Sequence, residues 1–335
     1  MYYYDEPYFY FNTIVYIRNT CEKFFSFVGS RLLKNKKTDM LHFLPSFILG
    51  PLSLFLFILN LIFWMIFLTP IGLIKQVLPE GRLRNFLRVL LTLIVKGWID
   101  VNTVILWITQ KVYWDVQGMD GLPKKTWLIL VSNHRSWVDI IILQKFLNHR
   151  LPFLKFFLKQ ELRKVPLLGF AWHALDYPFM KRYTSEEIAV NPDLKGKDLE
   201  AVREGCKKFK TFPVTIITFP EGTRFSEKKQ EFQKSPYKNL LKPKAGGLAY
   251  VMTEMTDFLA GIVNVTILYS PEKVEFWDLL SGRVKKVVVR VEFLSVPGEL
   301  TNGDYDCDVE YRQKFQEWLN DLWEEKNGLI EKILS

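Results

Sequence analysis

The sequence predicts an α/β domain with a mostly parallel sheet and flanking helices, preceded by a membrane-embedded helical hairpin or span. Two observations lead to this prediction. Residues 40–74 carry no Asp, Glu, Lys or Arg, which is typical of a membrane segment. Beyond Trp114, short β-branched or aromatic runs alternate with segments of helical periodicity. Strands that alternate with helices indicate a parallel sheet whose crossovers are helical.

Composition narrows the class of protein before any motif is considered. The 335 residues are 49% hydrophobic and 24% charged, a balance that excludes a disordered chain and a disulfide-stapled miniprotein. Lys and Arg number 45 against 36 Asp and Glu, so the formal net charge is +9 and an anionic partner is favoured. Aromatic residues make up 15%, which favours a lipid surface over nucleic acid. The three cysteines include no CxxC pair, which indicates a reducing compartment.

The chain divides into four predicted parts. Residues 1–40 form an N-terminal extension that opens with a tyrosine-rich run and closes with basic residues. No small-residue cleavage site follows it, so a secretory signal peptide is not predicted. A membrane-anchoring helical region is expected at 41–113, the α/β domain at 114–300, and a C-terminal amphipathic helix at 301–335.

The uncharged stretch at 40–74 is the strongest composition signal in the chain. A membrane-crossing helix needs roughly 20 residues, so this stretch is too long for one straight span and short for two. Basic residues flank both ends, and a kinked or re-entrant hairpin would keep both flanks on the cytoplasmic face. Pro51 and Pro70 are the expected breaks. The next segment, 86–114, is apolar with four charged residues, as an interfacial helix or second hairpin arm would be; a buried core helix is the alternative.

The α/β domain is predicted from apolar runs bounded by turn or charged residues. Runs of strand length, rich in β-branched and aromatic residues, are expected to form strands at 128–131, 214–219, 261–268 and 287–293. Segments with helical periodicity are expected to form helices at 140–147, 198–210 and 309–334. The last of these has its apolar residues on one face, which is typical of an amphipathic helix.

The first polar cluster, NHRSWVD at 133–139, directly follows a predicted strand. Open α/β sheets bind ligands where a strand ends and a helix begins. His134 and Asp139 are five residues apart, so they can meet only if His134 lies in the loop before the helix. Asp139 would then fix one imidazole nitrogen and leave the other as a base. The alternative is a helix cap, in which Ser136 and Asp139 satisfy backbone donors and His134 is an ordinary loop residue.

The second polar cluster, FPEGTR at 219–224, ends another predicted strand. Gly222 permits a turn with positive φ, and Arg224 would then project from the same sheet edge as His134. There its planar guanidinium is suited to a phosphate, which it can bind through two hydrogen bonds. The alternative is a turn whose surface arginine pairs with Glu221.

Together, the two clusters resemble the NHxxxxD and FPEGTR motifs of the glycerolipid acyltransferase family, the lysophosphatidic acid acyltransferases. The Arg-Ser-Trp filling of the first motif looks like the bacterial branch of that family. Residues 159–169, followed by 179–182, are similar to the family's middle block, which helps to bind the acceptor. The fourth block falls at 262–266, where Asn264 stands in place of the usual proline. The resemblance covers about 114–268.

The resemblance implies transfer of an acyl chain from acyl-CoA or acyl carrier protein to the free hydroxyl of 1-acylglycerol 3-phosphate, giving phosphatidic acid. It implies that His134 deprotonates the acceptor hydroxyl and that Asp139 orients His134. The residues that would bind the acceptor's glycerol phosphate are Glu221, Gly222, Thr223, Arg224, Lys159 and Arg182. Neither a metal nor a bound cofactor is indicated, and the acyl donor enters as a substrate.

The predicted partners are a phospholipid membrane, the lysophospholipid acceptor and the acyl donor, with no nucleic acid. An anchor at 41–113 would hold the catalytic domain at 114–300 at headgroup depth, on the cytoplasmic face of the inner membrane. Two alternatives stay open. One is a lysophospholipid acyltransferase of phospholipid remodelling that takes a different acceptor, and the other is a non-catalytic lipid-binding scaffold.

Overall fold

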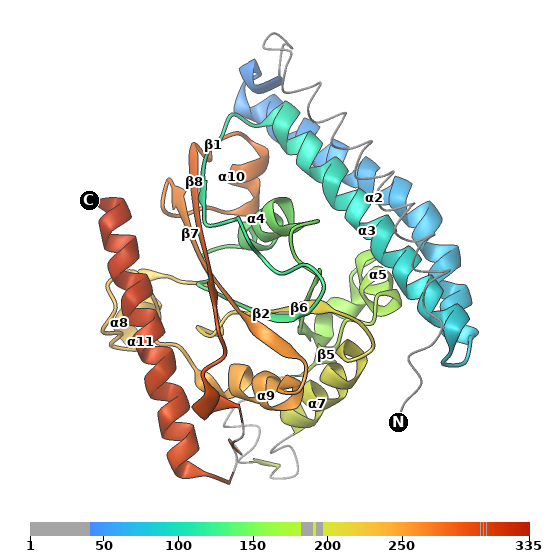
Figure 1. The fold of residues 1–335 in the computed structure, drawn as a ribbon. Coiled ribbons are helices and arrows are strands. Elements are labelled where there is room, and N and C mark those ends of the chain that lie inside the picture. Colours follow the sequence, from blue (N-terminus) through green and yellow to red (C-terminus); the bar gives the residue numbers. More distant parts are fainter. Residues whose placement is uncertain (1–40, 182–189, 192–196, 302, 304, 306) are drawn as a thin grey trace.

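The computed structural model describes residues 41–335 except 182–189, 192–196, 302, 304 and 306 (Figure 1). The predicted N-terminal extension lies outside the described residues, and so does Arg182. The described part comprises an α/β domain and a long helical hairpin that runs along one side of it (Figure 1).

A six-stranded sheet forms the centre of the α/β domain. Its strands lie in the order β1, β8, β7, β2, β6 and β3, and every neighbouring pair is parallel except β7 with β8. Their bounds are Tyr113–Gln117 (β1), Trp127–Ser132 (β2), Phe153–Phe156 (β3), Val214–Thr218 (β6), Leu259–Ser270 (β7) and Lys286–Leu294 (β8). The mostly parallel sheet predicted from the sequence is confirmed.

The sequence pattern misses the two edge strands, β1 and β3. Each is short and carries a charged residue near its middle, Asp115 in β1 and Lys155 in β3. Neither segment therefore forms the uninterrupted apolar run that predicts a strand. Edge strands tolerate such residues because one side of the strand has no neighbour.

Helices cover both faces of the sheet. Successive side chains of β2 point to opposite faces, where they pack into two different hydrophobic cores. Ile129 and Val131 pack with residues of α7, α9 and α11, whereas Leu128 and Leu130 pack with residues of α3, α4 and α10. The helices of the α/β domain are α4 (Val138–Leu147), α5 (Leu168–Ala174), α7 (Lys197–Phe209), α8 (Glu227–Phe232), α9 (Ala245–Met255), α10 (Phe276–Leu280) and α11 (Val309–Leu334). The predicted terminal helix coincides with α11.

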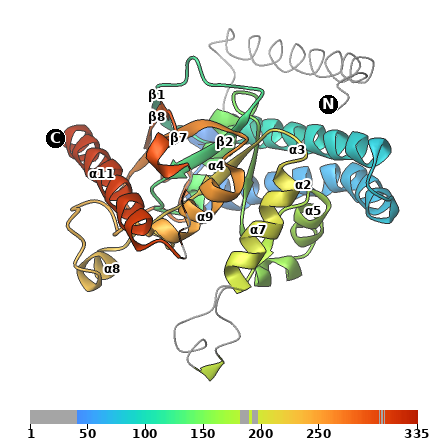
Figure 2. The same ribbon diagram turned by 60° about the horizontal axis from the view of Figure 1, so that its bottom comes forward.

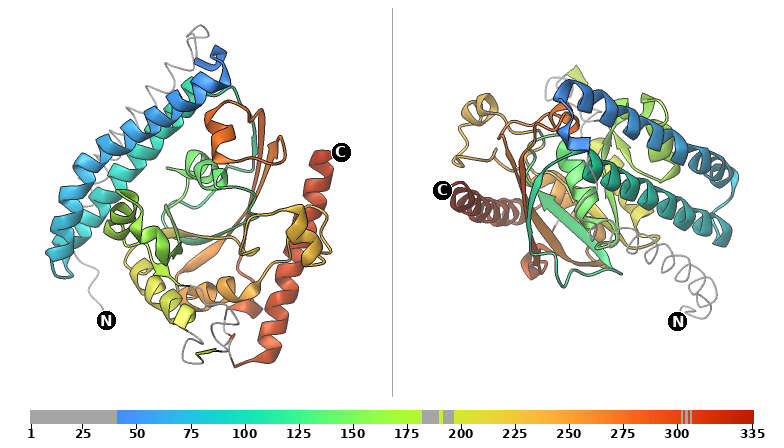
Figure 3. Two further views of the ribbon diagram at one scale, coloured as in Figure 1. Left: turned by 180° about the vertical axis from the view of Figure 1, so that it is seen from behind. Right: turned by 90° about the horizontal axis from the view of Figure 1, so that it is seen from above.

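An antiparallel pair of long helices, α2 (Ser46–Val77) and α3 (Arg82–Thr109), precedes the sheet. The two lie side by side in every view (Figures 1, 2 and 3). By length and composition, both are long and apolar enough to cross a membrane. The side-chain amide of Asn60 in α2 donates to Asn102 Oδ1 and to the Trp98 carbonyl in α3, which fastens the two arms together.

The helical hairpin is confirmed, but the breaks predicted at Pro51 and Pro70 are wrong. α2 runs through both prolines, and the chain reverses at 78–81, where Pro79 and Gly81 favour a turn. An internal proline removes one backbone hydrogen bond of the helix. Packing of α2 against α3 and against the α/β domain offsets that loss.

α2 is docked against the α/β domain near both of its ends. Gly50 lies against Trp277 of α10, and Gly72 lies against Phe170 and Ala174 of α5. A Cβ at Gly50 would come within 2.7 Å of Trp277, and one at Gly72 within 2.9 Å of Ala174. The hairpin therefore lies lengthwise along the domain. Large apolar side chains of α2 stay exposed, among them Phe47, Phe55, Ile58, Phe63, Ile66, Phe67 and Ile74.

Candidate active site

The two polar clusters predicted from the sequence meet at one edge of the sheet. β2 and β6 are parallel neighbours, so the loops that follow them leave from the same edge. The backbone N–H of Phe225 donates to the His134 carbonyl over 2.7 Å, and the N–H of His134 donates to Glu221 Oε1 over 3.1 Å. Direct hydrogen bonds thus join the segments 133–139 and 219–226.

His134 lies in the loop between β2 and α4, and Asp139 lies in the first turn of α4. This placement brings His134 Nδ1 to 2.8 Å from Asp139 Oδ2. The same carboxylate oxygen accepts the backbone N–H groups of Arg135 over 2.7 Å and Ser136 over 2.9 Å. One buried carboxylate therefore contacts the imidazole and also holds the backbone of the loop that leads into α4.

The imidazole of His134 is held by this hydrogen bond and by a ring stack. The Phe219 ring stacks on it with ring centroids 4.2 Å apart and 23° between the planes. The His134 side chain keeps 19% of its surface exposed. No hydrogen-bond partner of Nε2 occurs among the described residues. Nε2 is therefore the ring nitrogen that can meet an incoming hydroxyl.

Sequence reasoning misses Tyr269, which holds the other oxygen of Asp139. The Tyr269 hydroxyl donates to Asp139 Oδ1 over 2.5 Å, from near the end of β7. Burial raises the pKa of Tyr269 well above its usual value, and the neighbouring Asp139 raises it further, so the hydroxyl stays a donor. The two residues are 130 positions apart, and no spacing signal connects them.

Asn133 attaches the loop to β7. Its side chain accepts the N–H of Ile267 over 2.8 Å and donates to the Ile267 carbonyl over 2.9 Å. The side-chain amide thus continues the hydrogen bonding between β2 and β7 beyond the last paired residues, Ser132 and Val265. The loop that carries His134 therefore starts from a fixed point.

Glu221 is buried beneath the loop that follows β6. One of its carboxylate oxygens accepts the N–H of His134, and the other accepts the N–H of Leu241 over 3.2 Å. Burial raises the pKa of Glu221 to about 8. The alternative that Arg224 pairs with Glu221 at the surface is wrong, because this carboxylate is inside the fold.

The turn after β6 presents three of the predicted substrate-binding residues. Gly222 adopts a φ of 70°, as expected for this turn. Thr223 Oγ1 accepts a hydrogen bond from Lys229 Nζ over 2.7 Å. Arg224 is exposed, and its guanidinium carbon lies 5.4 Å from the centre of the Trp137 ring. Trp137 is itself 55% exposed, so the pair stands at the surface beside the loop between β2 and α4.

Two further predicted residues belong to the middle block. Lys159 is exposed at the end of β4 (Leu158–Lys159), which pairs with β5 (Phe179–Met180) in a separate two-stranded sheet. Within the described residues, no hydrogen bond or ion pair joins Lys159 to either polar cluster. Arg182 lies outside the described residues. Nor does the described part of the chain gather three or more His, Cys, Asp or Glu side chains in a group that could hold a metal ion.

The C-terminal helix supplies a buried lysine that sequence reasoning also misses. Lys326 of α11 donates to Asn264 Oδ1 over 2.6 Å, to the Val265 carbonyl over 2.7 Å and to the Thr266 hydroxyl over 3.1 Å. Burial lowers the pKa of Lys326 to about 7, and the charge of Glu221 opposes that shift. Asn264, in the position of the family's proline, thus serves as an acceptor for a buried ammonium group.

Residues 114–270 match the family model described as Acyltransferase. This segment of the chain is similar to the acyltransferase family. The resemblance predicted from the two motifs is thereby confirmed at the level of the family. The hairpin, β8 and α11 lie beyond the matched segment.

Curated relatives of this chain bear names of glycerolipid acyltransferases. The 2-acyl-1-lysophosphatidylinositol acyltransferase of Saccharomyces cerevisiae is 26% identical over 243 residues, which are 62% of this chain and 61% of that protein. The 1-acyl-sn-glycerol-3-phosphate acyltransferase 3 of Arabidopsis thaliana is 25% identical over 260 residues, 71% of this chain and 62% of that protein. The chain spans about three-fifths of the length of these relatives.

A bacterial protein of known structure has the same fold. The crystal structure of the 1-acyl-sn-glycerophosphate acyltransferase from Thermotoga maritima matches with a TM-score of 0.50 and 20% identity, over 84% of this chain and 98% of that one. The curated relatives named above come from a yeast and a plant, so the bacterial branch stays a prediction.

Replacing Tyr269 by Phe should lower the free energy of unfolding by about 1.5–3 kcal/mol, since it removes a hydrogen bond to a buried charged acceptor. Tyr177→Phe is the matched control, because the equally buried Tyr177 hydroxyl donates over 2.7 Å to the uncharged Leu154 carbonyl. That control should lose only about 0.5–1.5 kcal/mol. Urea unfolding measures both, and equal losses would contradict a charged acceptor at Tyr269.

Proposed function

We propose that this acyltransferase transfers an acyl chain from the thioester of acyl-CoA or acyl carrier protein to the free hydroxyl of 1-acylglycerol 3-phosphate, giving phosphatidic acid. The observation that carries the proposal is the 2.8 Å bond between His134 Nδ1 and Asp139 Oδ2 at an exposed sheet edge, with Arg224 on the adjoining turn. The names of the curated relatives support the reaction class.

In this proposal His134 is the general base. Its Nε2 takes the proton of the acceptor hydroxyl while the hydroxyl oxygen attacks the thioester carbonyl carbon. The C–S bond then breaks, and the departing thiolate takes the proton back from the imidazolium. Asp139 stabilises the imidazolium and fixes its orientation through Nδ1. A positioned base of this kind is worth roughly 10² to 10⁴ in rate.

The acceptor phosphate is assigned to the turn after β6. Arg224 supplies the guanidinium, and Gly222 and Thr223 bring the backbone close to the ligand. Trp137 keeps the Arg224 guanidinium at the surface beside the loop that carries His134. Glu221 acts from inside, by holding that loop against the turn. Lys159 and Arg182 are assigned as helpers on the acceptor side.

The hairpin is proposed to lie in the cytoplasmic leaflet of the inner membrane, the location that we expect from the sequence. α2 has 32 residues and is about 48 Å long at 1.5 Å per residue. Because it is docked lengthwise on the α/β domain, a perpendicular crossing would drag polar surface of that domain into hydrocarbon. Lying flat, α2 would instead present its exposed apolar side chains to lipid.

A second candidate keeps the chemistry and changes the acceptor. The yeast relative, 26% identical, is named for a lysophosphatidylinositol acceptor, which favours a lysophospholipid acyltransferase of phospholipid remodelling as the alternative. An assay of the purified protein with one labelled acyl thioester and a panel of lysophospholipids separates the two. If no acceptor is acylated, the remaining interpretation is a non-catalytic lipid-binding scaffold.

His134→Ala should abolish acyl transfer while the protein still folds and binds membrane vesicles, because the base is lost and the scaffold is kept. The matched control is His149→Ala, since His149 Nε2 also lies 2.8 Å from a carboxylate, Asp100 Oδ2, but joins α3 to the segment after α4. Activity is measured by transfer of the labelled acyl chain. Activity of His134→Ala at the level of the control would remove the general-base role.

Arg224→Ala should raise the apparent KM for the acceptor about tenfold or more and leave the KM for the donor nearly unchanged, because a hydrogen bond to a charged group contributes about 1.5–3 kcal/mol. Arg203→Ala, which removes an exposed arginine of α7, is the control. Steady-state kinetics with each substrate varied in turn provides the measurement. An unchanged acceptor KM would refute the phosphate-binding role of Arg224.

Cysteines placed at Ser46, the first residue of α2, and at Arg82, the first residue of α3 just after the turn that follows α2, should be labelled from the same side of the membrane if α2 lies flat. The background protein has its native cysteines replaced by alanine. Labelling with a membrane-impermeant maleimide in oriented vesicles reports the side. Labelling of the two positions from opposite sides would show that α2 crosses the membrane.

A further inference from the structure

Residues 224–244, here called the basic segment, begin at Arg224 on the turn after β6 and include α8. The basic segment holds seven Lys and Arg against two Glu, a net charge of +5 in a chain whose formal net charge is +9. All seven basic residues are exposed. More than half of the net positive charge of the chain is therefore concentrated beside the candidate active site. Such a concentration of one sign favours an anionic partner.

Phe232, the last residue of α8, is 90% exposed, more than any other large apolar side chain of the described residues. Lys228 precedes it by one helical turn, and Lys234 follows it closely. A single exposed apolar residue is common on soluble proteins and needs no explanation. An apolar side chain at the tip of a lysine-rich surface is, however, typical of a segment that contacts anionic lipid.

A series of contacts connects α8 with the hairpin. Lys273 Nζ lies 3.3 Å from Oε1 of Glu227, the first residue of α8, and Lys273 itself lies just before α10. Trp277 of α10 lies against Gly50 of α2. Phe276 and Trp277 are 37% and 41% exposed, so α10 adds apolar surface between α8 and α2.

The figures place α2 and α8 on the same side of the molecule. In the view from behind, α2 lies in front of α3, and α8 lies in front of α11 (Figure 3, left). In the view from above, α2 and α8 both lie along the upper side of the picture (Figure 3, right). A lipid surface on this side can therefore touch both helices at once.

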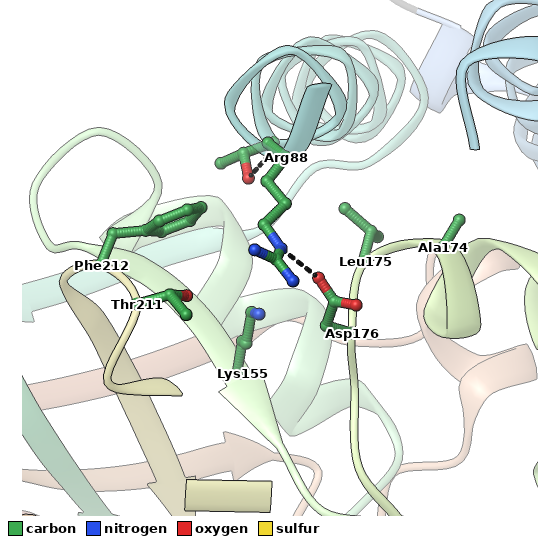
Figure 4. Close-up of a pocket in the computed structure, with 8 residues that line it drawn as sticks. Arg88, Lys155, Ala174, Leu175, Asp176, Thr211 and Phe212 are labelled. Atoms are coloured by element: carbon green, nitrogen blue, oxygen red, sulfur yellow. Dashed lines mark hydrogen bonds and ion pairs between the residues drawn. The ribbon is translucent and has the colours of Figure 1, made fainter. Parts of the chain in front are cut away.

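The hairpin is fixed relative to α8, because buried cationic side chains attach it to the α/β domain. Asp176 Oδ2, just after α5, accepts from Lys75 Nζ of α2 over 2.5 Å and from Arg88 Nε of α3 over 3.2 Å (Figure 4). Both cationic side chains are buried. The position of α2 in a membrane therefore also sets the distance of α8 from it.

We propose that the basic segment, with Phe232 at its tip, is a second membrane contact that binds an anionic lipid surface. This inference rests on the flat placing of α2 in the proposed function and adds a contact that the hairpin does not supply. The lysines attract the phosphate groups of the surface, and the Phe232 ring enters the boundary between headgroups and acyl chains. α4, which carries Asp139, lies between α2 and α8 in Figures 1 and 3. Two contacts would therefore hold the candidate site near the headgroups.

The first measurement places an environment-sensitive fluorophore at position 232. The full chain, with its native cysteines replaced by alanine, carries Phe232→Cys labelled with a nitrobenzoxadiazole dye. It is reconstituted in vesicles of phosphatidylcholine, alone or with roughly one third phosphatidylglycerol. Nitroxide-labelled lipids should quench the dye strongly in the anionic vesicles and weakly in phosphatidylcholine alone. A dye that stays unquenched in the anionic vesicles, or equal quenching in both, would overturn an anionic lipid contact at this position.

The matched control carries the dye at Lys124, through Lys124→Cys. Lys124 is exposed in the loop before β2, whereas His134 lies in the loop after β2. The two loops leave opposite ends of the same strand, so Lys124 lies at the sheet edge away from the candidate site. Its dye should stay unquenched in both kinds of vesicle. Quenching equal to that at position 232 would overturn the assignment to the basic segment.

The double variant Lys228→Gln with Lys234→Gln tests the charge. In anionic vesicles it should lower the ratio of lipid-exposed to water-exposed dye at position 232 about tenfold or more, since each lysine near the surface adds attraction. Lys124→Gln with Lys125→Gln removes the same net charge at the opposite sheet edge and should leave this ratio nearly unchanged. Equal losses in the two double variants would show that only the net charge of the molecule matters, which would overturn the proposal.

An acidic protein is the other class of partner that a basic surface fits. If the basic segment binds acyl carrier protein, Lys228→Gln with Lys234→Gln should raise the KM for its thioester, and the dye at position 232 should stay in water. That pair of results would overturn the lipid contact. Absence of acyl transfer by the unaltered protein would contradict the proposed reaction alone, because the quenching measurement needs no turnover.

Discussion

The candidate active site depends on one buried carboxylate, that of Asp139. It accepts hydrogen bonds from His134 Nδ1, from two backbone N–H groups and from the Tyr269 hydroxyl. A carboxylate with no access to water is stable inside a protein only when such donors surround it. The donors come from the loop after β2 and from β7. Because the Asp139 carboxylate needs all of them, it fixes the loop, the start of α4 and the sheet edge relative to one another. The orientation of the imidazole follows from that arrangement.

Segments beyond the matched family domain hold this edge in place. The Asn239 carbonyl accepts from Arg135, and the Asn239 backbone N–H donates to Asn327 Oδ1 of α11. Lys326 of the same helix donates to Asn264 of β7. The hairpin is attached in a comparable way, through buried polar side chains and not through apolar packing alone. The C-terminal helix and the hairpin therefore both contribute hydrogen bonds that hold the α/β domain.

Buried charged groups among the described residues are held in two different ways. Glu221 and Lys326 are buried, and each is met by two or more hydrogen-bonding groups. Lys145 and Lys155 are also largely buried, and each faces aromatic rings instead.

Local patterns in the sequence determined which segments form the central strands, the hairpin and α11, because apolar periodicity and uninterrupted apolar length are properties of neighbouring residues. They also determined that His134 and Asp139 could meet, since that required only a loop before a helix. The tertiary structure alone decided that Tyr269 reaches Asp139, that Lys326 reaches Asn264, and that Pro51 and Pro70 leave α2 unbroken. These outcomes depend on packing between residues far apart in the chain, and no spacing within the sequence records such contacts.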